Sequence, residues 1–200
     1  MLILVIGDLH VPHRATDLPP AFSKLLVPGK IQQTLCTGNL CDRETYDQLR
    51  SISADMHIVR GDMDEVLAPG LPVSKVISHG VIRIGLIHGH QIIPTDDNSA
   101  LEVTARQMDV DVLISGHTHR HGAAERGGRF YVNPGSATGA YSSVSRDPGS
   151  LLTPPFHSPD ADPVPSFMLM DIQGGNVVTY VYTLDDGEVK VEKIDYHKPM

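Results

Sequence analysis

The residues best suited to chemistry follow short apolar runs, each of which stops at a glycine. Carboxylate, amide and imidazole side chains stand at these ends: Asp8, His10, Asn39, Asp62, His88, His117 and His119. In α/β sheets, sites collect at the carboxyl ends of strands, so we expect these side chains to converge. A single Asp-x-His or His-x-His pair is commonly coincidental, and it is the succession of such ends that carries the prediction. Nitrogen and oxygen ligands without thiolate suit manganese, zinc or iron.

The elements that must position these residues are predicted from hydrophobic periodicity. Continuous apolar runs indicate buried strands at 2–6, 33–37, 56–60, 81–87 and 110–115. Helical spacing occurs between them at 19–26, at 42–52 and from 99 onward, with Asp17 and Ser99 as expected capping residues. This alternation predicts a largely parallel sheet with helices outside it.

The final third of the chain has a different pattern. Further strands are expected at 130–132, 166–172, 177–184 and 189–194 without helices between them. Because consecutive elements usually pack side by side, they predict a second, mostly antiparallel sheet against the first. The stretch 142–165 is rich in Ser, Pro, Asp and Gly and is interpreted as a mobile insert within one domain, residues 1–200.

Composition excludes several classes of protein. Sixteen Lys and Arg against 24 Asp and Glu give a net charge of −8, which argues against nucleic-acid binding and polybasic membrane attachment. No apolar stretch approaches the roughly 20 residues of a membrane span, and the first residues lack a signal-peptide pattern. The two cysteines, Cys36 and Cys41, form no disulfide framework, so we expect a cytoplasmic protein.

The succession Asp8-x-His10, Gly38-Asn39, Gly61-Asp62-Met63-Asp64, His88 and Gly116-His117-x-His119 resembles the motifs of the calcineurin-like metallophosphoesterases, over most of residues 1–140. The resemblance implies a four-layer α-β-β-α sandwich, in which two packed mixed β-sheets are flanked by helices. It also implies two metal positions. One is formed by Asp8, His10, Asn39 and His119, and the other by Asn39, Asp62, His88 and His117.

Two departures from the motifs bear on activity. Asn39 stands where active members have an aspartate that bridges both ions, and Met63 stands where they have a histidine facing the phosphate. Two divalent ions about 4 Å apart repel by roughly 16 kcal/mol at an effective dielectric constant of ~20, which a neutral amide offsets poorly. A thioether cannot donate a proton, and loss of a general acid removes a factor of about 10²–10⁴ in rate. We therefore expect weak or partial occupancy by zinc or manganese, and no efficient catalysis.

A closer resemblance is to the small-subunit family of retromer. It is carried by blocks spread over the whole chain, at 4–14, 26–32, 36–41, 57–62, 85–91, 133–141 and 169–173. The resemblance implies a non-catalytic scaffold in endosomal protein sorting, which requires no metal. It implies an α-solenoid partner subunit on the metal-pocket face and accessory regulators on an apolar patch of the opposite face. Membrane contact would be indirect, on endosomes through the complex.

Candidate partner contacts follow from two local patterns. Ile93 belongs to an apolar pair directly after His88-Gly89-His90, although both isoleucines could instead pack inward. Tyr180 and Tyr182 alternate along one strand face, and Leu2 and Leu169 match family positions near the patch, although an ordinary core face would show the same alternation. The alternative function is a weak metal-dependent phosphoesterase, which the histidines and Asp8 keep open.

Overall fold

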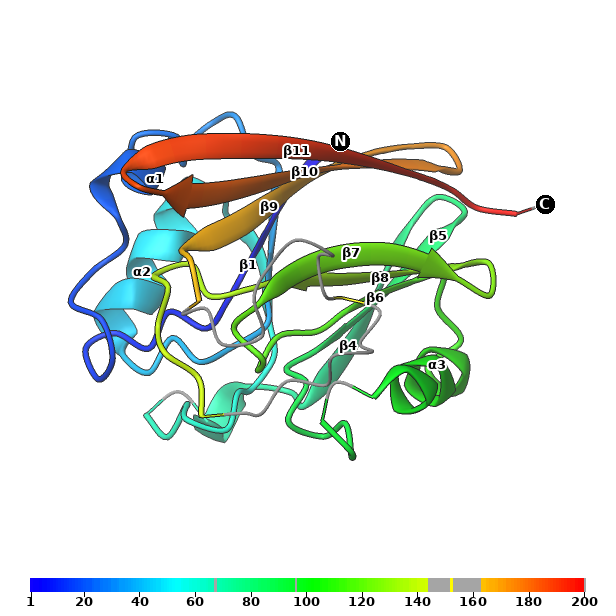
Figure 1. Ribbon diagram of the computed structural model, residues 1–200, viewed down its shortest axis with the longest axis horizontal. Helices are drawn as coiled ribbons and strands as arrows, with labels where there is room; N and C mark the ends of the chain where they lie inside the picture. Colours follow the sequence, from blue (N-terminus) through cyan, green and yellow to red (C-terminus); the bar gives the residue numbers. More distant parts are fainter. Residues whose placement is uncertain (67, 96, 144–151, 153–162, 200) are drawn as a thin grey trace.

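The computed structural model describes residues 1–66, 68–95, 97–143, 152 and 163–199, and shows two β-sheets packed face to face (Figure 1). The first sheet has the order β11-β10-β9-β1-β2-β3 and the second β4-β5-β6-β8-β7. Their strands are β1 (Leu2–Ile6), β2 (Gln33–Cys36), β3 (Asp55–Ile58), β4 (Ser74–His79), β5 (Ile82–Ile87), β6 (Val112–Ile114), β7 (His121–Arg126), β8 (Arg129–Pro134), β9 (Ser166–Gln173), β10 (Asn176–Asp185) and β11 (Glu188–His197).

Three helices complete the layers. α1 (Pro20–Ser23) and α2 (Arg43–Ile52) pack on the first sheet, α3 (Asn98–Gln107) packs on the second, and η1 (Ala68–Gly70) is a 3₁₀ turn. The predicted sandwich of two mixed sheets flanked by helices is thus confirmed, with thin helical layers. Of the described helices, none is long and apolar enough to cross a membrane.

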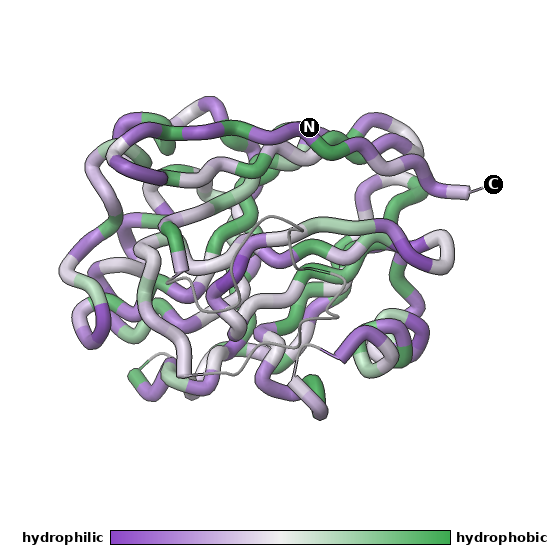
Figure 2. The backbone as a smooth tube through the Cα atoms, viewed as in Figure 1, coloured by the Kyte–Doolittle hydropathy of each residue, from purple (hydrophilic) through white to green (hydrophobic). Residues whose placement is uncertain are grey.

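Strand β1 lies at the centre of the fold and is buried on both faces. Ile3 and Val5 point into the cluster between the sheets, whereas Leu4 and Ile6 point into the cluster beneath α1 and α2. Successive side chains of a strand alternate between its faces, so a strand covered on both sides must be continuously apolar. In Figure 2, green apolar segments occur in the strands of both sheets. The loop after β1 therefore starts from a rigid position.

The expected second sheet is wrong in its membership. β9 pairs antiparallel with β1, so β9, β10 and β11 extend the first sheet, while β8 joins the second sheet beside β6. The described chain crosses between the sheets after β3 and again after β8, so β5 and β6 also lie in the second sheet and not, as expected, in the first. The rule of sequential neighbours does not anticipate these crossings. β4 and β7 were not predicted because they are polar edge strands, of sequence Ser-Lys-Val-Ile-Ser-His and His-Gly-Ala-Ala-Glu-Arg.

Two predicted helix caps are also wrong. α3 begins two residues earlier than Ser99 implies, because the Asp97 carboxylate accepts a hydrogen bond from Ala100 N at 2.7 Å. α1 has no side-chain cap, and Asp17 instead accepts from the adjacent Leu18 N. At α2 the Asp42 side chain caps the helix by accepting from Thr45 N at 2.6 Å. An aspartate in the β region fits the N-cap position well in both longer helices.

Most of the predicted insert, at 144–151 and 153–162, lies outside the described residues. Within it, Leu152 is described and is buried in the apolar cluster that also contains Leu101 and Tyr131. Its backbone approaches Gly122 so closely that a Cβ on that glycine would overlap the Leu152 carbonyl. The division into one domain, residues 1–200, with an insert stays a prediction.

Candidate metal pocket

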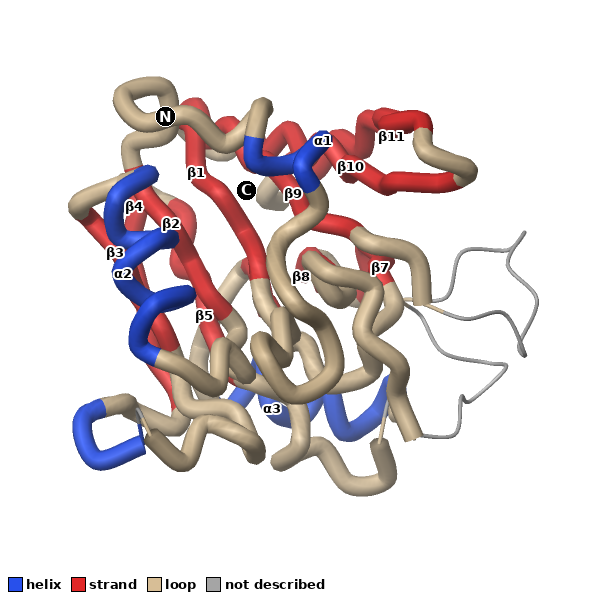
Figure 3. The backbone as a smooth tube through the Cα atoms, turned by 90° about the vertical axis from the view of Figure 1, so that its left-hand side faces the viewer, coloured by secondary structure: helices blue, strands red, loops and turns tan. Residues whose placement is uncertain are grey.

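The loops that follow β1, β2, β3, β5 and β6 meet at one end of the sandwich, below the strands in Figure 3. Left-handed backbone at several polar residues breaks the alternation of the strands, so that residues two apart can turn toward one cavity. These residues are Asp8 (φ 50°), His10 (φ 52°), Asn39 (φ 57°), His117 (φ 72°) and His119 (φ 61°). The structure brings six of the seven predicted ligands together in two adjoining clusters, and Asn39 lies between the clusters.

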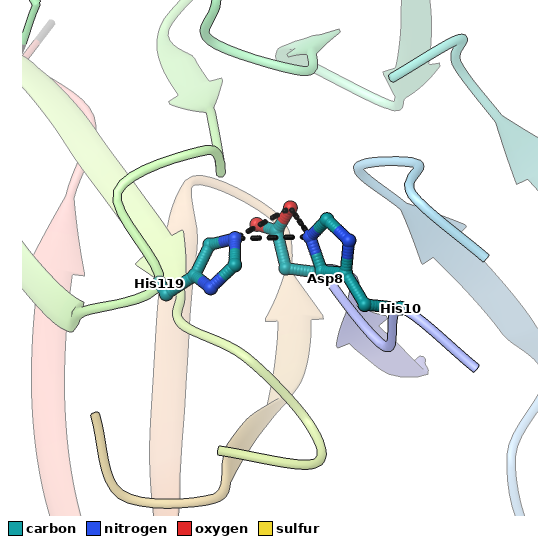
Figure 4. Close-up of side chains that lie close together, drawn as sticks. All are labelled: Asp8, His10 and His119. Atoms are coloured by element: carbon teal, nitrogen blue, oxygen red, sulfur yellow. Dashed lines mark hydrogen bonds and ion pairs between the residues drawn. The ribbon is translucent and has the colours of Figure 1, made fainter. Parts of the chain in front are cut away.

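The first cluster contains Asp8, His10 and His119, all at most 2 % exposed. The Nε2 atoms of the two histidines lie 3.0 Å apart, and Asp8 Oδ1 lies 3.7 Å from each of them (Figure 4). All three side chains thus present a potential ligand atom to the same small volume. Two imidazoles and one carboxylate form a mixed donor set that suits zinc or manganese.

The second cluster contains Asp62, His88 and His117. Asp62 Oδ1 lies 2.9 Å from His88 Nε2 and 3.8 Å from His117 Nδ1. Within the described part of the chain, the two clusters are the groups of three His, Cys, Asp or Glu residues whose ligand atoms all lie within 4.8 Å of one another. His117 and His119 therefore lie in different clusters.

Backbone carbonyls fix the orientation of two imidazoles. His88 Nδ1 lies 2.7 Å from Thr37 O, and His119 Nδ1 lies 2.7 Å from Ala140 O. A carbonyl only accepts, so each Nδ1 carries a proton, and in the neutral ring each Nε2 presents a lone pair to its cluster. Metal-ligating histidines commonly donate their second ring N–H in this way. The donor sets and their orientation fit a divalent cation.

Asn39 stands between the two clusters and presents an amide to both of them. Its Nδ2 lies 2.8 Å from Asp62 Oδ1, 3.1 Å from His88 Nε2, and 3.3 Å from both Asp8 Oδ1 and His10 Nε2. An amide nitrogen has two hydrogens, so it can donate to one acceptor of each cluster at a time. The Asn39 Oδ1 points away and accepts from Met63 N at 2.9 Å.

Both carboxylates of the pocket are ionised at neutral pH. Burial raises the pKa of Asp8, but His88, His10 and His119 outweigh it and lower the pKa to about 2. Hydrogen bonds from His117 and His88 hold the pKa of Asp62 below its ordinary value. The same two carboxylates raise the pKa of His88 against the opposing effect of its burial. The two ionised carboxylates therefore stabilise a positive charge in the pocket, either that of a metal ion or that of a proton on His88.

The sequence prediction missed Asp64, which holds the Asn39 loop in place. Asp64 is 2 % exposed. Its two carboxylate oxygens accept four backbone hydrogen bonds, from Asn39 N (2.7 Å), Gly61 N (2.8 Å), Leu40 N (2.9 Å) and Cys41 N (3.1 Å). The signal was present in Gly61-Asp62-Met63-Asp64, a run with two acids of which only the first was assigned. Asp64 ties the loop after β2 to the loop after β3.

Replacing Asn39 with Asp should separate the roles of hydrogen bond and charge. In chelator, Asn39→Asp places a third carboxylate between Asp8 and Asp62, and we expect a loss of about 2–4 kcal/mol in unfolding free energy. With Mn²⁺ or Zn²⁺ the added charge should strengthen binding at least about tenfold by calorimetry. Asn176→Asp on the exposed surface is the control. Unchanged metal affinity and unchanged stability would contradict this account of Asn39.

Removing Asp64 should destabilise the pocket loops as a unit. Asp64→Ala leaves four backbone N–H groups without their acceptor, and we expect a loss of at least about 3 kcal/mol in urea unfolding. Asp47→Ala on the exposed face of α2 removes only a surface pair with Arg43 and should change stability by less than about 1 kcal/mol. Equal effects of the two substitutions would refute the role given to Asp64.

Comparison with known proteins identifies the family. Residues 1–173 match the calcineurin-like phosphoesterase superfamily domain. The chain is 43 % identical over 199 residues to vacuolar protein sorting-associated protein 29 of Schizosaccharomyces pombe, and the match covers 100 % of both chains.

Solved structures give the same result. Chaetomium thermophilum Vps29 is 49 % identical with a TM-score of 0.89, and 100 % of both chains is covered. Entamoeba histolytica Vps29, crystallised in complex with Zn²⁺, is 50 % identical with a TM-score of 0.84, and 98 % of this chain and 99 % of that chain are covered. The chain therefore belongs to the Vps29 family, within the calcineurin-like phosphoesterase superfamily.

Proposed function

We propose that the chain acts as the non-catalytic small subunit of retromer and binds the α-solenoid subunit through the face that carries the metal pocket. Family membership implies the broader role, that of a retromer subunit in protein sorting. The observation that carries the finer proposal is Ile93, which is 82 % exposed on the loop after β5. That loop begins at His88, a residue of the second cluster. The exposed Ile93 side chain gives a partner protein an apolar group to bury next to the pocket.

The neighbouring isoleucine resolves the alternative that the sequence left open. Ile92 is 4 % exposed and packs in the apolar cluster with Ile87 and Leu101. One member of the pair thus holds the loop to the core, and the other projects outward. This division supports Ile93 as the residue that enters the partner.

We propose that accessory regulators bind an apolar patch formed by Leu2, Leu169, Tyr180 and Tyr182. All four are partly buried on the outer face of the first sheet, where Leu169 lies opposite Tyr180 in the β9–β10 pair. Tyr182 stacks on Phe167 at 4.7 Å between ring centroids, so its partly exposed ring is held against the apolar cluster beneath α1 and α2. Partly exposed tyrosines suit interfaces because an apolar ring carries a polar hydroxyl.

The patch and the pocket involve different parts of the first sheet. Leu2, at the start of β1, lies about 20 Å of extended chain from Asp8, whereas Tyr182 lies on β10, opposite Phe167 of β9. We propose that the two surfaces bind separate partners. The patch borders α1, because Phe167, on which Tyr182 stacks, also packs edge-on against Phe22 of that helix.

The absence of efficient catalysis is proposed from two residues. The Asn39 amide cannot supply the negative charge that two ions at close spacing need. Met63, 37 % exposed beside Asn39, cannot act as a general acid. We propose Zn²⁺ or Mn²⁺ as a weak or partial occupant of the clusters, which the scaffold role does not require. In cells we place the chain in the cytoplasm and, through the complex, on endosomes.

A charged residue in place of Ile93 should disrupt the proposed contact with the solenoid subunit, whereas a charged residue in the opposite patch should not. Ile93→Asp should abolish co-purification with the retromer α-solenoid subunit, because a carboxylate replaces the apolar anchor, while the unfolding midpoint stays unchanged. Tyr180→Asp, on the opposite patch, is the matched control and should retain the solenoid subunit. Retention of the solenoid subunit by Ile93→Asp would exclude the proposed contact.

The alternative of a weak phosphoesterase is tested by restoring the missing groups. With Mn²⁺ and an aryl phosphate, the wild-type chain should turn over at least about 10²–10⁴-fold more slowly than an ordinary enzyme at about 10 s⁻¹. The double substitution Asn39→Asp with Met63→His should raise turnover by at least about tenfold, and adding His117→Ala should remove the gain. Ordinary enzymatic turnover by the wild type that disappears in His117→Ala would favour the enzyme.

A further inference from the structure

We infer that Gln91 is a positioning residue, which holds the loop of Ile93 in the conformation that the partner binds. The inference rests on the function proposed above and adds a second residue to the contact. Gln91 is exposed, yet both ends of its side-chain amide are engaged. A glutamine side chain in water normally samples many rotamers. Because both ends of the Gln91 amide are hydrogen-bonded, this side chain is ordered, and it limits the motion of the two segments that it joins.

The two hydrogen bonds join segments distant in sequence. The Gln91 Oε1 accepts from Gly89 N at 2.9 Å, which closes the turn just after His88. The Gln91 Nε2 donates to Val73 O at 2.9 Å, across to the segment before β4. In the same turn, Ile92 N donates to Gly89 O at 3.0 Å. The Gln91 side chain thus reinforces the turn from Gly89 to Ile92 at its first residue and ties that turn to the segment before β4.

The segment reached by Gln91 is itself attached to the pocket. Arg60 N donates to Pro72 O at 2.8 Å, next to Val73 and two residues before Asp62. On the other side of the loop, Gly89 (φ 117°) packs so closely on the Gly116 backbone that a Cβ would overlap it. Ile92 anchors the loop in the core. The Ile93 side chain therefore projects from a frame held at three points, and Gln91 supplies the point nearest the solvent.

The ordered turn should favour binding. A loop that is ordered before association loses little conformational entropy on binding, so less of the free energy of its contacts is spent on ordering it. Without Gln91 the turn would retain its core anchor at Ile92 and its contact at Gly116, and the protein would stay folded. The partner would then have to order the turn that carries Ile93. The cost would appear as a less favourable binding entropy with little change in stability.

The test measures the affinity of the full-length chain for the purified retromer α-solenoid subunit by calorimetry. Gln91→Ala should weaken binding about tenfold, the loss should lie in the entropy, and the thermal midpoint should stay near that of the wild type. Gln91→Glu retains the acceptor for Gly89 N but sets a carboxylate against Val73 O, and it should weaken binding similarly. Gln48→Ala on exposed α2 is the control and should bind as the wild type.

Hydrogen exchange of the amides at 89 and 92 gives an independent readout. Their exchange in the free protein should be faster in Gln91→Ala than in the wild type, because both sit in the turn that Gln91 closes. Wild-type affinity in both Gln91 variants, alongside lost binding in Ile93→Asp, would overturn this inference and leave the proposed function intact. Wild-type affinity in Ile93→Asp would overturn the proposed function and this inference with it.

Discussion

One amide group connects the two halves of the pocket. The Asn39 nitrogen lies within 3.3 Å of acceptors in both clusters, while its oxygen is engaged by Met63 N. A carboxylate at this place would leave three negative charges in contact and would need cations to hold them together. The amide instead donates to the carboxylates. We therefore propose that hydrogen bonds can hold the pocket in shape, with a metal as an optional occupant.

This arrangement makes the same residues suitable for a scaffold. Asp64 fixes the loop of Asn39 through four backbone hydrogen bonds, and the loop after β5 projects Ile93 from a frame that contains Gln91 and Ile92. Loops that hold catalytic groups rigidly in an enzyme can hold a contact surface equally rigidly. The proposed patch on β9 and β10 would give the same domain a second surface for a partner.

Sequence reasoning predicted the residues at strand ends well and the edges of the fold poorly. Asp8, His88 and the other predicted ligands follow continuous apolar strands, so both the strands and their convergence were visible in the pattern. β4 and β7 were missed because edge strands carry few apolar residues, and β9 was assigned to the wrong sheet because sheet membership depends on long-range pairing. Asp64 and Gln91 act through backbone groups, which leave no periodic trace in the sequence.

The central claim, that hydrogen bonds rather than ions hold the pocket, is tested most directly by hydrogen exchange in the presence of chelator. The amides bonded to Asp64, at 39, 40, 41 and 61, and the Asn39 side-chain amide report on the pocket itself. The account predicts that these groups stay protected after every metal is removed, with little added protection from Zn²⁺. Rapid exchange in chelator that Zn²⁺ suppresses would show that the ion holds the pocket, and would contradict it.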